Sequence, residues 1–210
     1  MLYSVSTEQI LRKEVAAMLP DVNLKAITEG DLIQVRNWLL DPEVNQMWYG
    51  CDENNQPLHT GYDLGFKEPE LNELVVRLEQ DRNRDVVSVL DSDNKHVGEG
   101  QLVYEWSLLE AQLFLLIGEK ELWHHHYGTA ALIKLLDYAF IEKGLHRIWV
   151  DVPEYNEPGM QMVQHLGFVV EGHLRKTHRK NDEWYDSSVL GLLAEEYPRR
   201  RAKFIEAVTT

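Results

Sequence analysis

The sequence contains a single cysteine, Cys51, among 210 residues. An intramolecular disulfide is therefore excluded, and a cytoplasmic location is the simplest expectation. Long apolar runs are also missing, because stretches such as QLFLLIG are far too short to span a membrane. The first residues lack a basic segment followed by an apolar one, so no signal peptide is predicted. These absences predict a globular protein without a membrane partner.

Positive charge is scarce: 21 lysines and arginines stand against 35 acidic residues, for a net charge of −14. Such a surface repels a polyanion, so no nucleic-acid partner is expected. An amine, a polyamine or a basic peptide is favoured instead. Acidity that serves solubility alone is an equally good explanation, so the charge biases the choice of partner without identifying one.

The remaining residues alternate between strand and helix patterns. Strands are predicted over 22–27, 85–91, 96–106, 111–118 and 146–152, and helices over 7–18, 28–40, 68–80, 127–144 and 156–168, before a terminal hairpin and a tail helix. No linker divides this order, which predicts a mixed α/β fold. We expect one domain over 21–197, a helical N-terminal extension over 1–20 and a helical tail over 198–210.

The run ELWHHHYGTAAL, residues 121–132, places three histidines directly before a helix pattern. Adjacent histidines point in different directions and make a poor chelate by themselves, so no metal site is predicted. A histidine can instead donate a hydrogen bond to an anion such as phosphate. An ordinary exposed loop is the competing interpretation.

Several motifs occur in a fixed order at near-constant spacing. They are VNLKAITEGDLIQVRNWLLDPEV, LIGEKELW…YGTAAL, DYAFIEKGLHRIWVDVPEYNE, QHLGFVVEGHLRK and DSSVLGLLAEEY. Together they resemble the GNAT superfamily of acyl-CoA-dependent N-acetyltransferases over about residues 22–197. Within it, they are most similar to the branch of ribosomal-protein N-terminal and spermidine acetyltransferases.

The resemblance implies a central mixed, mostly antiparallel twisted sheet flanked by helices, in which two splayed strands form the CoA cleft. It further implies that acetyl-CoA is the co-substrate and that an acetyl group moves to a primary amine by direct attack. The acceptor would be a small amine, a polyamine or a peptide N-terminus. A homodimer is one option for the assembly.

The resemblance places the histidines in the loop that binds the pyrophosphate of acyl-CoA, where the family carries Arg/Gln-x-x-Gly-x-Gly/Ala. Trp123 stands at the Arg/Gln position, His126 at the first glycine and Gly128 at the second, and His124 replaces a residue that is commonly glycine. The helix that follows still offers free N–H groups and a partial positive charge to an anion. Three interpretations stay open: histidines recruited to phosphate, a loop that binds CoA less tightly, and an exposed loop that still binds it.

The residues expected to contact the cofactor follow from the same resemblance. The strand LFLLIG would pair its free backbone groups with the pantetheine arm, as in strand addition. The expected set is Leu116, Ile117, Gly118, Trp123, His124, His125, His126, Tyr127, Gly128, Thr129 and Asn156.

The catalytic groups are less well defined. Val163 stands where many family members carry a tyrosine that protonates the thiolate, and Gln112 stands where this branch often carries a glutamate base. The remaining candidates for the base are Glu99, Glu105 and Glu110. The alternative to an active enzyme is therefore a catalytically weak or silent GNAT-fold protein that binds or senses a ligand.

Two histidines of the predicted terminal hairpin, His173 and His178, are further residues that could face the substrate cleft.

Overall fold

The computed structural model describes residues 19–209, and the predicted N-terminal helix over 7–18 lies outside these residues. Seven strands form one sheet in the order β1-β2-β3-β4-β5-β7-β6. The strands are β1 (Val22–Ala26), β2 (Arg84–Asp91), β3 (His96–Glu105), β4 (Glu110–Ile117), β5 (Arg147–Pro153), β6 (Val169–Lys180) and β7 (Glu183–Leu193). Only β4 and β5 pair in parallel, so the predicted mixed, mostly antiparallel sheet is confirmed.

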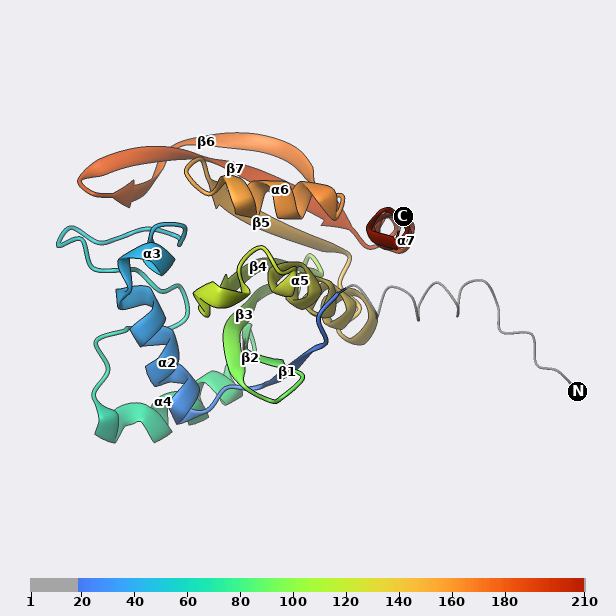
Figure 1. Cartoon of the computed structure of the whole chain (residues 1–210). Coiled ribbons are helices and arrows are strands. Elements are labelled where there is room, and N and C mark those ends of the chain that lie inside the picture. Colours follow the sequence, from blue (N-terminus) through green and yellow to red (C-terminus); the bar gives the residue numbers. More distant parts are fainter. Residues whose placement is uncertain (1–18, 210) are drawn as a thin grey trace, which may run out of the picture.

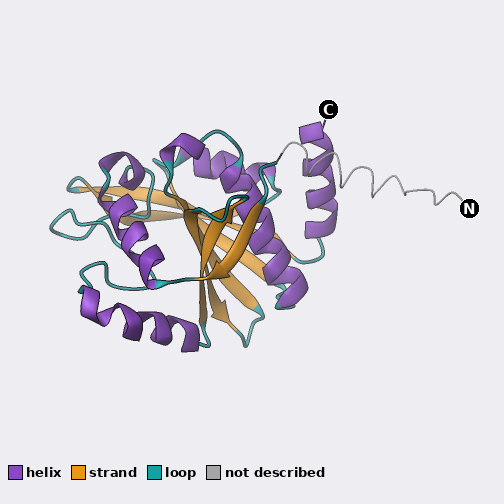
Figure 2. Cartoon of the chain, turned by 60° about the horizontal axis from the view of Figure 1, so that its bottom comes forward, coloured by secondary structure: helices purple, strands orange, loops and turns teal. Residues whose placement is uncertain are grey.

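Helices cover both faces of this sheet (Figures 1 and 2). They are α2 (Glu29–Leu40), α3 (Pro42–Asn45), α4 (Leu71–Gln80), α5 (Tyr127–Asp137), α6 (Glu157–His165) and α7 (Tyr197–Thr209), with a 3-10 turn before α4 (Glu68–Glu70), another before α5 (Lys120–Leu122) and a π-helical end to α5 (Tyr138–Glu142). Helices α5 and α6 bury their apolar residues against one face, and α2 and α4 against the other. Within residues 19–209, no helix is both long and apolar enough to cross a membrane.

Helix α2 begins where the sequence predicts. The Thr28 hydroxyl accepts a hydrogen bond from the Asp31 N–H, and the Asp31 carboxylate accepts one from the Thr28 N–H at 2.9 Å, which satisfies two of the free donors at the helix start. The same carboxylate accepts from the Ser88 hydroxyl of β2 at 2.8 Å. This capping box therefore also ties the first turn of α2 to the sheet.

The sheet opens between its two parallel strands. Residues 110–112 of β4 pair with residues 147–149 of β5, and beyond them β5 pairs only with β7. The two strands run in the same direction, so the gap widens toward their carboxyl ends. We call this opening the wedge, and it is the splayed pair of strands that the resemblance implies.

Candidate active site

The backbone of β4 presents free groups to the wedge. The Gly118 N–H donates to the Val97 carbonyl of β3 at 3.0 Å. Because successive strand residues direct their backbone groups to opposite sides, Leu113, Leu115 and Ile117 direct theirs toward the wedge. An extended ligand chain can pair with such an unpaired strand.

Of the three predicted strand residues, only Ile117 directs its backbone groups to this edge. Leu116 pairs with Glu99 of β3, so its backbone groups face away from the wedge, and its side chain packs on the α2 side. The Ile117 carbonyl faces the wedge and accepts a hydrogen bond from the Trp123 indole N–H at 2.8 Å. Trp123 therefore anchors the loop to the end of β4 and occupies one acceptor that a ligand would otherwise find free.

The histidine loop keeps the backbone conformation of a glycine loop. His124 and His126 both have φ of 63°, in the left-handed region that costs an ordinary residue about 1–2 kcal/mol. These are the two positions where the family pattern carries or commonly carries glycine. At both positions the backbone therefore adopts a conformation that glycine reaches without strain.

Helix α5 starts directly after this turn. The Ala130 N–H makes the first helical bond, to the His126 carbonyl at 2.9 Å. The N–H groups of Tyr127, Gly128 and Thr129 accordingly lack a helical partner and are available to an anion. The side chains of all three histidines of the loop are exposed.

Helix α6 packs beside the start of α5. A Cβ atom on Gly128 would lie 3.2 Å from the Met162 sulfur of α6, so glycine allows the two helices to approach closely. Asn156 caps α6, and its side-chain oxygen accepts from the Gly159 N–H at 2.9 Å. The predicted loop residues, Gly128 and Asn156 thus belong to elements that meet at the wide end of the wedge.

A pair of glycine substitutions tests the loop geometry. His126→Gly is expected to leave the free energy of unfolding unchanged or to raise it by up to about 1 kcal/mol, because glycine adopts the left-handed region without strain. His125→Gly, at an ordinary backbone conformation, is expected to lower it by about 0.5–1 kcal/mol. Urea unfolding of both variants measures the difference. Equal losses at the two positions would contradict the assigned turn.

Two of the predicted catalytic carboxylates lie at the closed end of the wedge. Glu105 and Glu110 are opposite one another in the β3–β4 register. Glu110 forms an ion pair with Arg147 at 2.7 Å, and Glu105 accepts a hydrogen bond from the neighbouring Ser107 hydroxyl. Both lie at the end of β4 remote from the histidine loop, so the structure does not bring them together with the expected cofactor contacts.

The third candidate, Glu99, is buried and fully engaged. Its carboxylate lies 2.8 Å from His59 Nε2, 2.7 Å from the Tyr62 hydroxyl and 2.8 Å from the Gln101 amide nitrogen. His59 Nδ1 accepts from two backbone N–H groups, so the network assigns the proton to Nε2, which donates to Glu99. Burial, followed by the charge of Glu99, raises the pKa of Tyr62 and keeps its phenol a donor. Glu99 therefore holds the loop over residues 49–67 against β3.

The start of the same loop is fixed to the other half of the sheet. The Tyr155 hydroxyl donates to the Trp48 carbonyl at 2.9 Å, and the Cys51 N–H donates to the Arg179 carbonyl of β6 at 2.8 Å. Together with the Glu99 network, these contacts make the segment 48–62 a bridge across the two halves of the opened sheet. We call it the bridging loop.

An aromatic ring of the bridging loop lies between the two halves. The Tyr49 ring packs edge-on against Phe114 of β4, with centroids 5.7 Å apart, and against His178 of β6, with centroids 4.6 Å apart. His178 is buried, whereas His173 is exposed and lies 3.0 Å from the Ser188 hydroxyl. Of the two hairpin histidines, the structure turns only His178 inward.

Strand alternation accounts for this difference, because His173 pairs with Ser188 and His178 with Tyr185, and these two positions of β7 lie on opposite faces. A bulge shifts the register between them: four residue steps of β6, from Leu174 to His178, face two of β7, and Lys176 has φ of 56°. The bulge therefore places His178 opposite Tyr185, where an unbroken register would place Lys176. No turn residue in the sequence announces this bulge, so the sequence alone does not give the register of His178.

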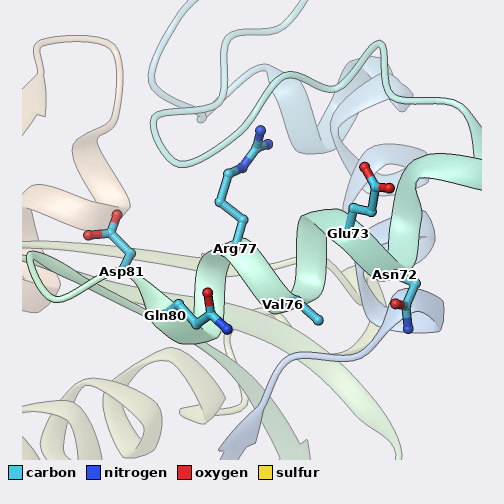
Figure 3. Close-up of a pocket in the computed structure, with 6 residues that line it drawn as sticks. All are labelled: Asn72, Glu73, Val76, Arg77, Gln80 and Asp81. Atoms are coloured by element: carbon cyan, nitrogen blue, oxygen red, sulfur yellow. The ribbon is translucent and has the colours of Figure 1, made fainter.

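Other features of the described residues contribute no site. No group of three or more histidine, cysteine or acidic residues within 19–209 is arranged to hold a metal ion. A shallow hollow of about 610 Å³ lies along α4 (Figure 3). Its lining residues come from α4 and the residue that follows it: Asn72, Glu73, Val76, Arg77, Gln80 and Asp81. None of them faces the wedge, whose edge is formed by β4 and β5.

A sheet that opens into a wedge, with the N-terminus of a buried helix at its wide end, defines the acyltransferase class that the sequence resembles. The chain belongs to the GNAT family of acetyltransferases, because the family model described as "Acetyltransferase (GNAT) domain" matches residues 21–169.

Individual relatives support this membership. The chain is 24% identical to a spermidine N(1)-acetyltransferase of Vibrio cholerae over 183 residues, which cover 87% of this chain and 99% of that protein. It is 40% identical to the probable N-acetyltransferase YjcK of Bacillus subtilis over 65 residues, or 31% of this chain and 36% of that protein. It is 32% identical to the uncharacterized N-acetyltransferase YnaD of Bacillus subtilis over 71 residues. This match covers 34% of this chain and 42% of that protein, which is less than half of its length.

Solved structures show the same fold. The spermidine N-acetyltransferase of Vibrio cholerae in complex with CoA and spermine superposes with a TM-score of 0.71 at 22% identity, over 84% of this chain and 98% of that chain. A dodecameric structure of a Vibrio cholerae spermidine N-acetyltransferase gives a TM-score of 0.69 at 23% identity, over 85% of this chain and 97% of that chain.

Proposed function

We propose that this protein transfers the acetyl group of acetyl-CoA to a primary amine, with aliphatic polyamines as the leading substrate class. The observation that carries the proposal is the wedge whose free β4 backbone leads to the unpaired N–H groups at the start of α5. A net charge of −14 favours a cationic acceptor, and a relative named spermidine N(1)-acetyltransferase supports the choice of polyamines.

Each part of acetyl-CoA would meet a different part of this site. The pyrophosphate would lie at the N–H groups of Tyr127, Gly128 and Thr129, where the helix dipole favours negative charge. The pantetheine arm would pair with the wedge-facing groups of Leu115 and the Leu113 carbonyl, because the Leu113 N–H belongs to the last β4–β5 pairing, that of Gln112 with Trp149. The thioester would then lie near the apex of the wedge, where the Leu115 N–H can polarise its carbonyl oxygen.

The reaction is a direct displacement. The neutral amine nitrogen attacks the thioester carbon, a C–N bond forms, and the C–S bond breaks to release the CoA thiolate. The thiolate takes up the proton that the nitrogen loses after attack. Val163 is 4% exposed in the core beside α5 and has no ionisable group, so the structure offers no side-chain acid at that position.

Two measurements test this proposal. We expect acetyl-CoA at 100 times its dissociation constant to stabilise the fold by about 2.7 kcal/mol, since it binds only the native state. We also expect free CoA thiol to appear when spermidine or spermine is added, and less of it with a peptide N-terminus or an aminoglycoside. Neither stabilisation nor CoA release with any of these amines would contradict the proposal.

A silent binding protein is the second candidate, because Val163 and Gln112 lack the groups that family members use. It predicts the same stabilisation by acetyl-CoA with no release of CoA above the rate of hydrolysis. Turnover with any amine of the panel removes this candidate.

A further inference from the structure

Asp151 lies where the wedge begins to open. It follows Trp149, the last residue of β5 that pairs with β4, by two positions, or about 7 Å along the strand. Ile148, Val150 and Val152 belong to the core under α5 and α6. Since strand residues alternate between faces, Asp151 points to the opposite face, the one that the bridging loop crosses.

Asp151 and His178 form a buried pair beneath the bridging loop. His178 Nε2 lies 3.1 Å from Asp151 Oδ2, and His178 Nδ1 lies 2.5 Å from the Tyr49 carbonyl oxygen. Because a carbonyl can only accept, Nδ1 carries a proton. The side chains of His178 and Asp151 are 1% and 9% exposed.

The second carboxylate oxygen of Asp151 has no partner. Oδ1 is shielded from solvent and makes no hydrogen bond to any of residues 19–209. Leaving a buried carboxylate oxygen unpaired is unfavourable, and most such atoms in proteins are satisfied by a partner, a water or a ligand. No side chain of residues 19–209 donates to Oδ1, so this oxygen can accept a hydrogen bond from an incoming N–H group.

The groups around Asp151 suit a cationic amine. Burial and then the charge of Asp151 raise the pKa of Tyr49, and burial is also the main cause of the raised pKa of Tyr155, so both phenols stay neutral near this carboxylate. The Tyr49 ring, between Phe114 and His178, covers the side of the pair that faces β4. An aromatic face next to a carboxylate is a favourable place for an ammonium group.

We propose that Asp151, oriented by His178, binds the acceptor ammonium group and takes its proton, and that the Tyr49 ring moves aside to admit it. This inference rests on the proposed function and names the base for that reaction. The ammonium R–NH₃⁺ gives one proton to Oδ1, and the resulting R–NH₂ attacks the thioester carbon. The second nitrogen proton leaves with the CoA thiolate as CoA–SH, and Asp151 returns its proton to solvent after product release.

Other titratable groups near Asp151 and His178 could also change the pH dependence of activity, so their effect must be measured apart from that of Asp151. The charge of Asp151 acts on Tyr49 and Tyr155, and Cys51 and Tyr185 also raise the pKa of Tyr155. Lys180 lies two residues along β6 from His178, and burial lowers the pKa of Lys180 to about 8, within the range of an enzyme pH profile. Its ammonium donates to the Asn45 and Gln46 carbonyls, so Lys180→Arg keeps donors there and removes the titration.

The decisive variant is Asp151→Asn, which keeps the size of the side chain. At pH 7 we expect kcat/KM for spermidine to fall at least about 100-fold, since the amine must then lose its proton unaided. The deficit should shrink about tenfold per pH unit up to pH 9, as more amine becomes neutral in solution. Thermal stabilisation of Asp151→Asn by acetyl-CoA should equal that of the wild type. Lys180→Arg should keep the wild-type dependence of kcat/KM on pH. Asp93→Asn, in an exposed turn, controls for the loss of one negative charge.

Binding of spermidine by calorimetry, without acetyl-CoA, provides a second measurement that does not need turnover. We expect Asp151→Asn and His178→Gln to weaken it at least about tenfold relative to wild type and Asp93→Asn. Wild-type binding that depends on Asp151, without turnover, would support the ammonium site and overturn the proposed function. A loss of activity that is the same at every pH, or variants within threefold of wild type in both measurements, would overturn the role of Asp151.

Discussion

Gly118→Ala is expected to lower the free energy of unfolding by about 3 kcal/mol, the upper end of the cost of overpacking a core. A Cβ atom at this position would lie 1.9 Å from Cδ2 of Trp38. The Trp38 ring cannot retreat easily, because its indole N–H donates to Glu119 at 3.1 Å and its ring packs against the His96 ring, with centroids 4.8 Å apart. Gly118 also connects β4 to the histidine loop, so acetyl-CoA binding should weaken together with stability.

Urea unfolding monitored by tryptophan fluorescence and by circular dichroism measures this effect. Gly172→Ala on β6 is the matched control, since nothing lies within 4 Å of the added Cβ, and it is expected to change stability by less than about 1 kcal/mol. Trp38→Leu should make room, so the double variant should be more stable than the sum of the two single changes predicts. Equal losses for Gly118→Ala and Gly172→Ala would contradict the packing described here.

Glu99→Ala is expected to lower the free energy of unfolding by about 3–5 kcal/mol, as for other buried charged networks that lose one partner. The change leaves buried donors of His59, Tyr62 and Gln101 without their acceptor. Because this network holds the bridging loop to β3, limited proteolysis should cut within residues 52–58 faster than in the wild-type protein.

The conservative variant Glu99→Gln separates a structural role from catalysis. It keeps one oxygen acceptor and the size of the side chain, so its stability should fall by about 1–2 kcal/mol. Its kcat at saturating amine should stay within threefold of wild type. Glu105→Gln, at an exposed site, should change stability by less than about 0.5 kcal/mol. A large loss of kcat in Glu99→Gln at unchanged stability would identify Glu99 as the base and contradict the structural role.

The histidine run shows which features of a loop can be predicted from the local sequence and which cannot. Its position directly before an apolar helix was predictable from the sequence, and the structure confirms that α5 begins at Tyr127. The left-handed backbone of His124 and His126 was not predictable, because a β-carbon disfavours this conformation and only the surrounding contacts impose it. One of these contacts is the hydrogen bond from the Trp123 indole to the Ile117 carbonyl at the end of β4. Trp123, at the position where the family carries Arg or Gln, therefore fixes the loop to the sheet.

The candidate carboxylates show where residue type alone misleads. Glu99, Glu105 and Glu110 share a chemistry in the sequence, yet one is buried in a hydrogen-bond network and two lie at the closed end of the wedge. Asp151 was not among the candidates, because a single acid in a strand-like run indicates no site. Its pairing with His178 joins residues 27 positions apart across β5, β7 and β6 and depends on the bulge in β6.

The sequence by itself determined the order of the strands and helices, the family to which they belong and the position of the histidine run directly before a helix. These properties follow from hydrophobic periodicity, helix caps and motif spacing, which act over a few residues at a time. The tertiary structure alone decided which acids are structural, how the bridging loop spans the opened sheet, and that Asp151 keeps an unpaired oxygen beside His178. Each of these depends on side chains brought together from distant strands, whose orientation is set by register and bulges that local pattern does not encode.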